Sequence, residues 1–331
     1  MPGTDVLLVS LGSTAGLRAA DEQLADALRR AGAGVALVAA RPPREVRTLA
    51  LTDLGWALAA RTAARAGIVA HAPRAIVYCT TTAALLWPRP GAIRFDAPAA
   101  ANRPGRHGVW QRPLERRRLA QAPLLVPQAP GALQEAGSPR SPSVIVPIGV
   151  EPSGPPGDTR DIAAIAYAAN PHKKGLDRIL AAWAAARHDG EELVVCGTEH
   201  VPATEGVRAT GALAPADYRS LLRRARVYVA APRREDYGVA QLEALADGCA
   251  LVTNAAPGPY AALPIARALD ARLVGDDLAG ALRIALDGPA PDYAARALAA
   301  IAPYRRAAVD ATVRDELLPT LLRGGRASSA P

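Results

Sequence analysis

Lysine is nearly absent from this sequence. Only two of its 39 basic residues are lysines, Lys173 and Lys174, and the other 37 are arginines. This ratio indicates a coding preference for arginine, so an ordinary surface charge is expected as Arg. The two lysines stand side by side in "NPHKKGLDRIL" and therefore suggest a chemical role. The simpler alternative is that they are solvated loop charges that precede a helix.

Cysteine and long apolar runs are also scarce. The three cysteines, Cys79, Cys196 and Cys249, lie far apart in apolar stretches, so neither a disulfide framework nor a cysteine metal site is expected. No run of about eighteen apolar residues is present to span a bilayer. The first residues, "MPGTDVLLVSLGSTAG", lack the basic start of a secretory signal. These features predict a cytoplasmic protein.

The length and charge of the chain constrain its organisation and its partners. Its 331 residues are enough for two domains, and the net charge is +8. Most arginines alternate with acids on helical patterns, so no nucleic-acid partner is expected. The densest basic segment, which includes Trp110, contains Arg103, Arg106, Arg112, Arg116, Arg117 and Arg118. It is either a helix face with interspersed charge or a surface for anionic lipid or a phosphorylated acceptor, so peripheral membrane contact stays open.

Short apolar runs alternate with helical patterns along the whole chain. "DVLLVSLG" (5–12), a helix and "GVALVAA" (34–40) form one βαβ unit. A second series of strands and helices begins after the Pro/Gly-rich stretch 146–161. The fold class predicted is α/β, with two Rossmann-like doubly wound domains that face a cleft. Ligands of such sheets bind beyond the carboxyl ends of the strands.

The segment "PRREDYGVAQLEALADGCALVTN" (232–254) carries the most chemical information. Glu235 lies in the loop after a strand, and Glu243 lies eight residues later, inside the following helix. Backbone N–H groups at Tyr237, Gly238 and Val239, where that helix begins, can hold phosphate oxygens. Glu243 is suited to accept hydrogen bonds from a sugar diol. An acidic first helical turn would explain Glu235 but not a glutamate inside an apolar helix.

This segment resembles the donor site of retaining glycosyltransferases of the GT-B type, particularly family 4. The resemblance rests on the Glu-x7-Glu spacing, the following "PGPY" and the upstream "VPIGVEP", and it covers most of residues 144–290. It implies an acceptor domain over 1–150, completed by a helix at about 305–323, and a nucleotide-sugar donor domain over 151–304. Residues 324–331 are expected to form a flexible tail.

The resemblance gives the lysines a role. The family holds the nucleotide diphosphate with an Arg and a Lys in a "GRxxxxKG" element, and "YAANPHKKGLD" matches it at Lys174 and Gly175. The family's Arg falls at about Ala169, so Lys173 or Arg234 is expected to replace it. Catalytic roles are thus implied for Lys174 and for Glu235, which would contact the donor sugar. The remaining donor-binding residues expected are Glu243, Tyr237, Gly238, Val239, Asn170, Gly197 and Gly211, together with Gly12, Ser13 and Gly16 from the first loop of the other domain.

The N-terminal half is expected to hold the acceptor, which is a sugar, a lipid or a small molecule. Asp96 follows an apolar strand and either orients an acceptor hydroxyl as a third catalytic residue or caps a turn. No Asp-x-Asp occurs in the chain, so the resemblance implies a metal-independent transferase that needs no cofactor besides the nucleotide sugar. Two other functions remain open: a nucleotide-sugar epimerase and a non-catalytic protein that binds a nucleotide.

Overall fold

The computed structural model describes residues 3–44, 48–103, 105–154 and 160–327. The chain divides into two compact units, one made of residues 1–149 and 306–331 and the other of residues 150–305. Each unit contains a five-stranded sheet in which every strand pair is parallel. The predicted fold class, two Rossmann-like α/β domains, is therefore confirmed.

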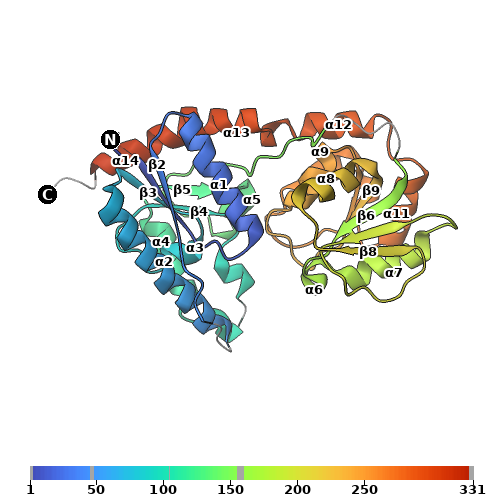
Figure 1. Cartoon of the computed structure of the whole chain (residues 1–331), viewed down its shortest axis with the longest axis horizontal. Coiled ribbons are helices and arrows are strands. Elements are labelled where there is room, and N and C mark those ends of the chain that lie inside the picture. Colours follow the sequence, from blue (N-terminus) through green and yellow to red (C-terminus); the bar gives the residue numbers. More distant parts are fainter. Residues whose placement is uncertain (1–2, 45–47, 104, 155–159, 328–331) are drawn as a thin grey trace. The chain divides into compact units, whose positions relative to one another are not determined.

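The N-terminal unit is built on a sheet of order β2-β1-β3-β4-β5 (Figure 1). Its strands are β1 (Val6–Ser10), β2 (Val35–Ala39), β3 (Ala75–Tyr78), β4 (Ala92–Phe95) and β5 (Leu125–Pro127). The helical segments are α1 (Ala15–Arg30), α2 (Leu49–His71), α3 (Thr81–Ala84), η1 (Ala99–Asn102), η2 (Gly105–Gly108), α4 (Gln111–Gln121) and α5 (Pro130–Glu135). The central strands are buried on both faces, which explains their continuous apolar sequences.

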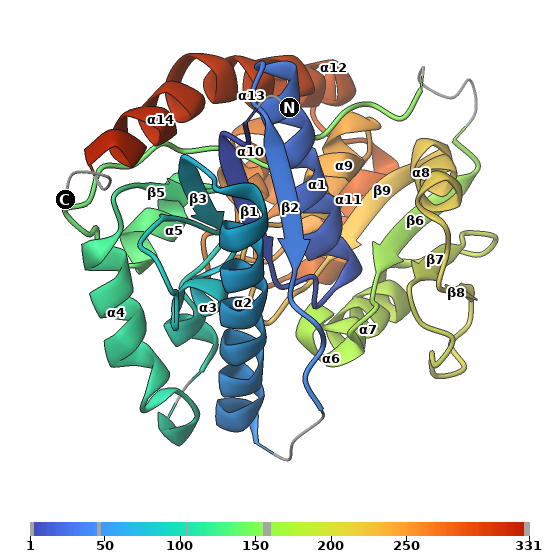
Figure 2. The same cartoon turned by 60° about the vertical axis from the view of Figure 1, so that its left-hand side comes forward.

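Helices cover both faces of this sheet. Leu24 and Leu28 of α1 pack on one face, and Ala60 and Ala64 of α2 pack on the other together with Leu119 of α4. Figure 2 shows α2 and α4 on the same side of the sheet, with α3 between them. Small alanines on α2 allow a close approach of the helix to the strands.

The end of the chain returns to the N-terminal unit. The last helical segments, α13 (Arg306–Thr312), the π-helical η5 (Val313–Leu317) and α14 (Leu318–Ala327), lie on the α1 side of the sheet. Val313 and Leu317, one helical turn apart, are buried in the same core as α1, and Arg30 forms a bidentate ion pair with Asp310. Helix α14 continues to Ala327 and so includes residues 324–327 of the segment expected to be a flexible tail, whereas residues 328–331 lie outside the described ranges.

The C-terminal unit has a sheet of order β10-β9-β6-β7-β8. Its strands are β6 (Ile162–Tyr167), β7 (Leu193–Cys196), β8 (Val207–Gly211), β9 (Ala225–Ala230) and β10 (Ala250–Thr253). Its helical segments are α6 (Pro171–Lys174), α7 (Leu176–Ala186), α8 (Pro215–Arg224), α9 (Val239–Ala246), α10 (Ala262–Leu269), η3 (Ala271–Leu273), α11 (Leu278–Asp287), α12 (Tyr293–Ala300) and η4 (Ala302–Tyr304). Helix α7 packs against α11, whereas α8 and α9 lie over the other face of the sheet (Figure 1).

All three cysteines lie within the described residues. Cys79, Cys196 and Cys249 are buried and form no disulfide. Within the described part of the chain, no helix combines the length and apolar character needed to cross a membrane.

Candidate active site

The loop after β9 carries Glu235 and is held firmly by the loop after β10. The backbone N–H of Glu235 donates to the carbonyl of Pro257 at 3.0 Å, and the N–H of Ala261 donates to the carbonyl of Tyr237 at 2.9 Å. Gly258 has a φ of +115°, and a side chain there would overlap the carbonyl oxygen of Glu235. The "PGPY" sequence therefore fits against the "REDYG" loop because its glycine has no Cβ.

A short helix brings Lys174 to this loop. Asn170 caps α6 by accepting a hydrogen bond from the N–H of Lys173 at 2.9 Å. Gly175 ends the helix in the left-handed conformation, with φ +65°, and a side chain there would overlap the carbonyl of Ala231. The close approach that this glycine allows places Lys174 beside the end of β9.

Lys174 and Glu235 form a tight ion pair. Lys174 Nζ lies 2.6 Å from Glu235 Oε2, and Gln241 Nε2 donates to the same oxygen at 3.1 Å. The Glu235 side chain is 7% exposed and that of Lys174 is 22% exposed. The first glutamate of the Glu-x7-Glu pair is thus in direct contact with the second lysine of "HKKG", although the two residues are 61 positions apart in the sequence.

Lys173 belongs to a neighbouring charge cluster. Its Nζ lies 3.1 Å from Asp236 Oδ2, and Arg234 Nε lies 2.8 Å from Asp236 Oδ1. With the adjacent Lys174–Glu235 pair, the cluster brings together three cations and two carboxylates. This excess of positive charge suits an anionic ligand such as a diphosphate.

Helix α9 starts immediately after the loop. Gly238 precedes it with a φ of +90°, and no side chain caps the first N–H groups. A Cβ at Gly238 would lie 2.9 Å from Tyr260 Cε2, so the tight turn requires glycine. Val239 is partly exposed, whereas Tyr237 and Gly238 are buried. The helix start therefore offers uncapped N–H groups at the edge of the charge cluster.

Glu243 lies on α9 and pairs with an arginine and not with Lys173 or Lys174. Its carboxylate is 3.3 Å from NH1 of Arg219 on α8, and Arg219 Nε bonds Asp247 Oδ2 at 2.7 Å. Burial raises the pKa of the Glu243 carboxyl, while the Arg219 guanidinium opposes that rise. Arg219 thus favours the charged form of Glu243, which is the better hydrogen-bond acceptor.

Strands β7 and β8 lie on the other side of β6 from β9 and end at the same carboxyl edge of the sheet. Gly197 after β7 donates its N–H to the carbonyl of Gly211 at the end of β8, at 2.8 Å. Both have positive φ, and a Cβ at Gly197 would lie 2.8 Å from the backbone N of Ala169. Asn170, Gly197 and Gly211 therefore lie at the carboxyl edge of this sheet, where ligands of doubly wound sheets bind.

The other candidates lie in the N-terminal unit. Gly12 has a φ of +59°, and its carbonyl accepts from Arg18 NH1 at 2.7 Å. Ser13 is exposed in the loop, but Gly16 is not a loop residue as expected, because Thr14 caps α1 and the helix begins at Ala15. Asp96 is half-buried after β4 and accepts a hydrogen bond from the N–H of Ala97 at 2.8 Å. This bond is typical of a turn residue and leaves the hydroxyl-orienting role of Asp96 a prediction.

A buried ion pair that sequence reasoning missed lies beneath the loops of the N-terminal unit. Asp21 of α1 accepts from Ser10 Oγ at 2.5 Å and from Arg94 NH1 at 3.0 Å, and all three residues are at most 3% exposed. Burial raises the pKa of Asp21, and Arg94 works against this rise. The network joins β1, β4 and α1 at the edge of the sheet.

Gln241 and Arg219 are the residues near the two glutamates that the sequence analysis overlooked. Gln241 could have been predicted from the sequence, since it is a second polar residue in the apolar stretch "VAQLEALA". Arg219 could not have been predicted, because it lies on another helix, 24 residues before Glu243 in the sequence. Among the residues that the structure describes, no group of three His, Cys, Asp or Glu side chains is placed to hold a metal ion.

The fold of both units and the sequence of the C-terminal unit are similar to those of known proteins. Two parallel-sheet domains of this kind are the fold of GT-B glycosyltransferases, and residues 159–286 match the family model described as Glycosyl transferases group 1. The matched range includes Lys174, Glu235 and Glu243. A search of curated protein sequences gives no match.

Solved structures agree with this class of fold. The chain is similar to α,α-trehalose 6-phosphate synthase from Burkholderia multivorans, with a TM-score of 0.68 and 13% identity over 99% of this chain and 100% of that one. It is similar to sucrose-phosphate synthase from Thermosynechococcus elongatus, with a TM-score of 0.67 and 16% identity over 98% of each chain. It is also similar to WaaG, a glycosyltransferase involved in lipopolysaccharide biosynthesis, with a TM-score of 0.64 and 14% identity over 98% of this chain and 100% of that one.

Proposed function

We propose that this protein is a glycosyltransferase that moves a sugar from a nucleotide diphosphate to an acceptor hydroxyl with retention of configuration. The observation that carries the proposal is the 2.6 Å contact between Lys174 and Glu235 within the family-matched segment. It joins the Lys174 ammonium to the first member of the Glu-x7-Glu pair at the carboxyl edge of the sheet. The GT-B fold supports the same class of reaction.

Each end of the donor has a matching group in the C-terminal unit. Lys174 and Lys173 neutralise the charge that develops on the departing diphosphate, and the uncapped start of α9 adds backbone N–H groups. Glu243, held by Arg219, accepts hydrogen bonds from the ribose hydroxyls. Glu235 contacts the sugar once the diphosphate draws Lys174 toward its oxygens.

The reaction needs no resident metal in this proposal. The sequence lacks Asp-x-Asp, and the cations beside Glu235 and Asp236 supply the positive charge that a divalent ion supplies elsewhere. Activity is therefore expected to survive dialysis against a chelator. An absolute requirement for added Mn²⁺ or Mg²⁺ in the transfer step would contradict this part of the proposal.

Two measurements in sequence test the function. A thermal-shift screen of nucleoside diphosphates and their sugars identifies the donor, because a ligand that binds only the folded state raises the apparent Tm. Turnover of that donor is then followed by release of the nucleoside diphosphate with candidate acceptors. Binding without any turnover would indicate a non-catalytic nucleotide-binding protein, and epimerised nucleotide sugar would indicate an epimerase. The proposal predicts free nucleoside diphosphate and a glycosylated acceptor.

A further inference from the structure

The net positive charge of this protein comes from one segment of the sequence. Between residues 49 and 121 the sequence has 11 arginines and three acidic residues, whereas the rest of the chain has 28 basic and 28 acidic residues. The whole formal charge of +8 therefore comes from the segment that runs from α2 to α4.

None of the three acids of this segment is exposed. Asp53 is 4% exposed and forms a bidentate pair with Arg103, with bonds of 2.6 and 3.0 Å. Glu115 is 1% exposed and accepts from the N–H of Ala99 at 2.7 Å. Asp96 is half-buried after β4. Within residues 49–121 as the structure describes them, no exposed acidic side chain accompanies the arginines on the outer sides of α2 and α4.

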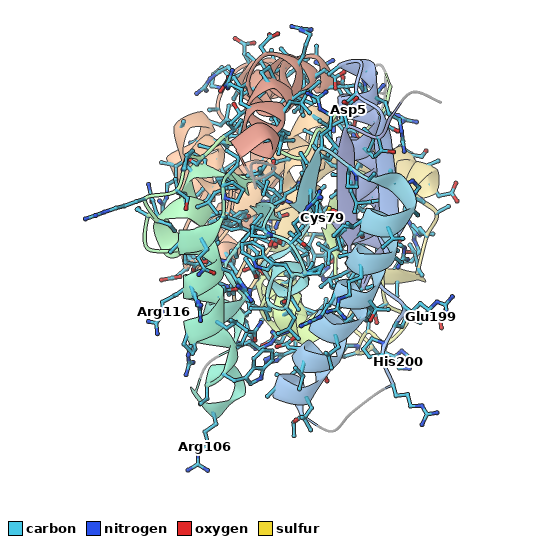
Figure 3. The ribbon with its side chains drawn as sticks, turned by 90° about the vertical axis from the view of Figure 1, so that its left-hand side faces the viewer. Asp5, Cys79, Arg106, Arg116, Glu199 and His200 are labelled. Carbon is cyan, nitrogen blue, oxygen red and sulfur yellow. The ribbon has the colours of Figure 1, made fainter. Side chains whose placement is uncertain are left out.

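Four of these arginines form no bond to a described residue through their charged groups. Arg65, Arg106, Arg116 and Arg117 are exposed, and their side chains form no hydrogen bond or ion pair with any described residue. Figure 3 shows Arg106 and Arg116 pointing outward from the η2–α4 region. Such charges are available to a partner. Arg112, in contrast, is bonded to backbone carbonyls.

Large apolar side chains are exposed beside these arginines. Five of the eight that are exposed in the described residues belong to this segment, namely Leu49, Leu51, Leu58, Val69 and Val109. Val69 is 85% exposed and Val109 is 62% exposed. Spacings of seven and eleven residues place Leu51, Leu58 and Val69 on one stripe of α2, opposite the alanines that pack on the sheet.

Two contacts join the segment that precedes α4 to the first turns of α2. Trp110 Nε1 donates to the carbonyl of Ala50 at 3.3 Å, and Arg103 pairs with Asp53. Both α2 and α4 contribute to the same core on one face of the sheet, so their outer sides both face away from it (Figures 2 and 3). We call this surface the α2–α4 face, defined by Leu51, Leu58, Val69, Val109, Arg65, Arg106, Arg116 and Arg117.

We propose that the α2–α4 face binds the surface of a membrane that contains anionic lipids. Arginine attracts lipid phosphates, and exposed leucine and valine gain free energy by entering the boundary between headgroups and acyl chains. A nucleic acid would use the arginines but offer nothing to the aliphatic stripe. The inference does not depend on the glycosyl-transfer proposal, because every group in it lies in the N-terminal unit.

Vesicle flotation tests this proposal with the full chain. The protein is expected to float with phosphatidylglycerol–phosphatidylcholine vesicles, not with phosphatidylcholine alone, and to bind less as salt rises. Each basic side chain near an anionic surface is worth roughly a fivefold change in partitioning, so the triple variant Arg106→Gln, Arg116→Gln, Arg117→Gln should bind roughly 100-fold more weakly. The double variant Leu51→Ser, Val109→Ser should also bind more weakly.

A matched control separates a specific face from general basicity. Arg140, Arg267 and Arg323 are exposed outside the segment, and replacing all three by Gln gives the same net charge as the first triple variant. This control should float like the parent, and melting curves should show that every variant is folded. The proposal is wrong if the parent does not float with anionic vesicles or if both triple variants lose equal binding. It is also wrong if the Leu51/Val109 variant binds vesicles like the parent and duplex DNA displaces them.

Discussion

Removal of the Lys174 ammonium gives the most direct test of the donor site. In Lys174→Ala, the Glu235 carboxylate keeps Gln241 Nε2 at 3.1 Å but loses the cation at 2.6 Å. The variant therefore changes two quantities at once: the stability of the folded unit and the stabilisation of a departing diphosphate. The two effects have different sizes and separate assays.

The stability effect follows from burial. Stripping the partner from a fully buried charge costs about 3–5 kcal/mol. Lys174 is 22% exposed, so water replaces part of its contribution, and we expect a loss of about 1–3 kcal/mol in the free energy of unfolding. The double variant Lys174→Met, Glu235→Gln removes both charges and should recover most of this loss.

The catalytic effect should be larger and should not be recovered. Loss of a preorganised group that stabilises developing charge costs about 2–4 kcal/mol, which corresponds to a decrease of roughly 30- to 1,000-fold in kcat/KM. Lys174→Arg should restore only part of the activity, because a planar guanidinium fits a tight site less well than an ammonium. Lys173→Ala should cost less, since Lys173 is 44% exposed and pairs with Asp236.

The assay is kcat/KM for the donor at saturating acceptor, measured beside a thermal melt of each variant. A Lys174→Ala protein that transfers sugar as fast as the parent would refute the assignment and make the two lysines ordinary surface charges. Recovery of full activity in the double variant would also refute it, since that variant restores stability without restoring a cation.

Three further predictions concern the glutamates and the loop that holds one of them. Glu243→Gln should weaken binding of the bare nucleoside diphosphate in calorimetry, whereas Glu235→Gln should leave that affinity nearly intact and slow transfer; equal losses of affinity would contradict separate roles. Because burial raises the pKa of Glu243, nucleotide affinity should fall as the pH drops through a range above that of an ordinary glutamate. Arg219→Leu removes the opposing charge and should move this fall to still higher pH, and an unchanged binding profile would exclude the coupling. Gly258→Ala should lower the free energy of unfolding by about 2–4 kcal/mol, because its Cβ would overlap the Glu235 carbonyl at a positive φ. Gly275→Ala, where the Cβ meets nothing within 4 Å, should melt like the parent.

The sequence by itself determined the kind of fold and the loop and helix on which Glu235 and Glu243 lie. Apolar runs at strand length that alternate with helical periods require buried parallel strands covered by helices, which is what both units show. The Glu-x7-Glu spacing placed Glu235 in a loop and Glu243 inside α9, because both positions depend only on where one helix begins. The rarity of lysine predicted a chemical role for Lys173 and Lys174. The structure pairs them with Asp236 and Glu235, and their role stays a prediction.

Only the tertiary structure decided which distant side chains meet. Lys174 lies in α6 after β6, and Glu235 lies in the loop after β9. These two strands are neighbours in the sheet, although β7, β8, α7 and α8 separate them in sequence. Arg219 reaches Glu243 because α8 and α9 cover the same face, and no spacing in the sequence encodes that contact. The uneven distribution of charge could be counted from the sequence, but only the structure showed that Asp53 and Glu115 are buried and leave the arginines of α2 and α4 as the exposed charges among the described residues 49–121. Local periodicity fixes the elements, whereas strand order, which depends on how whole elements pack, fixes their partners.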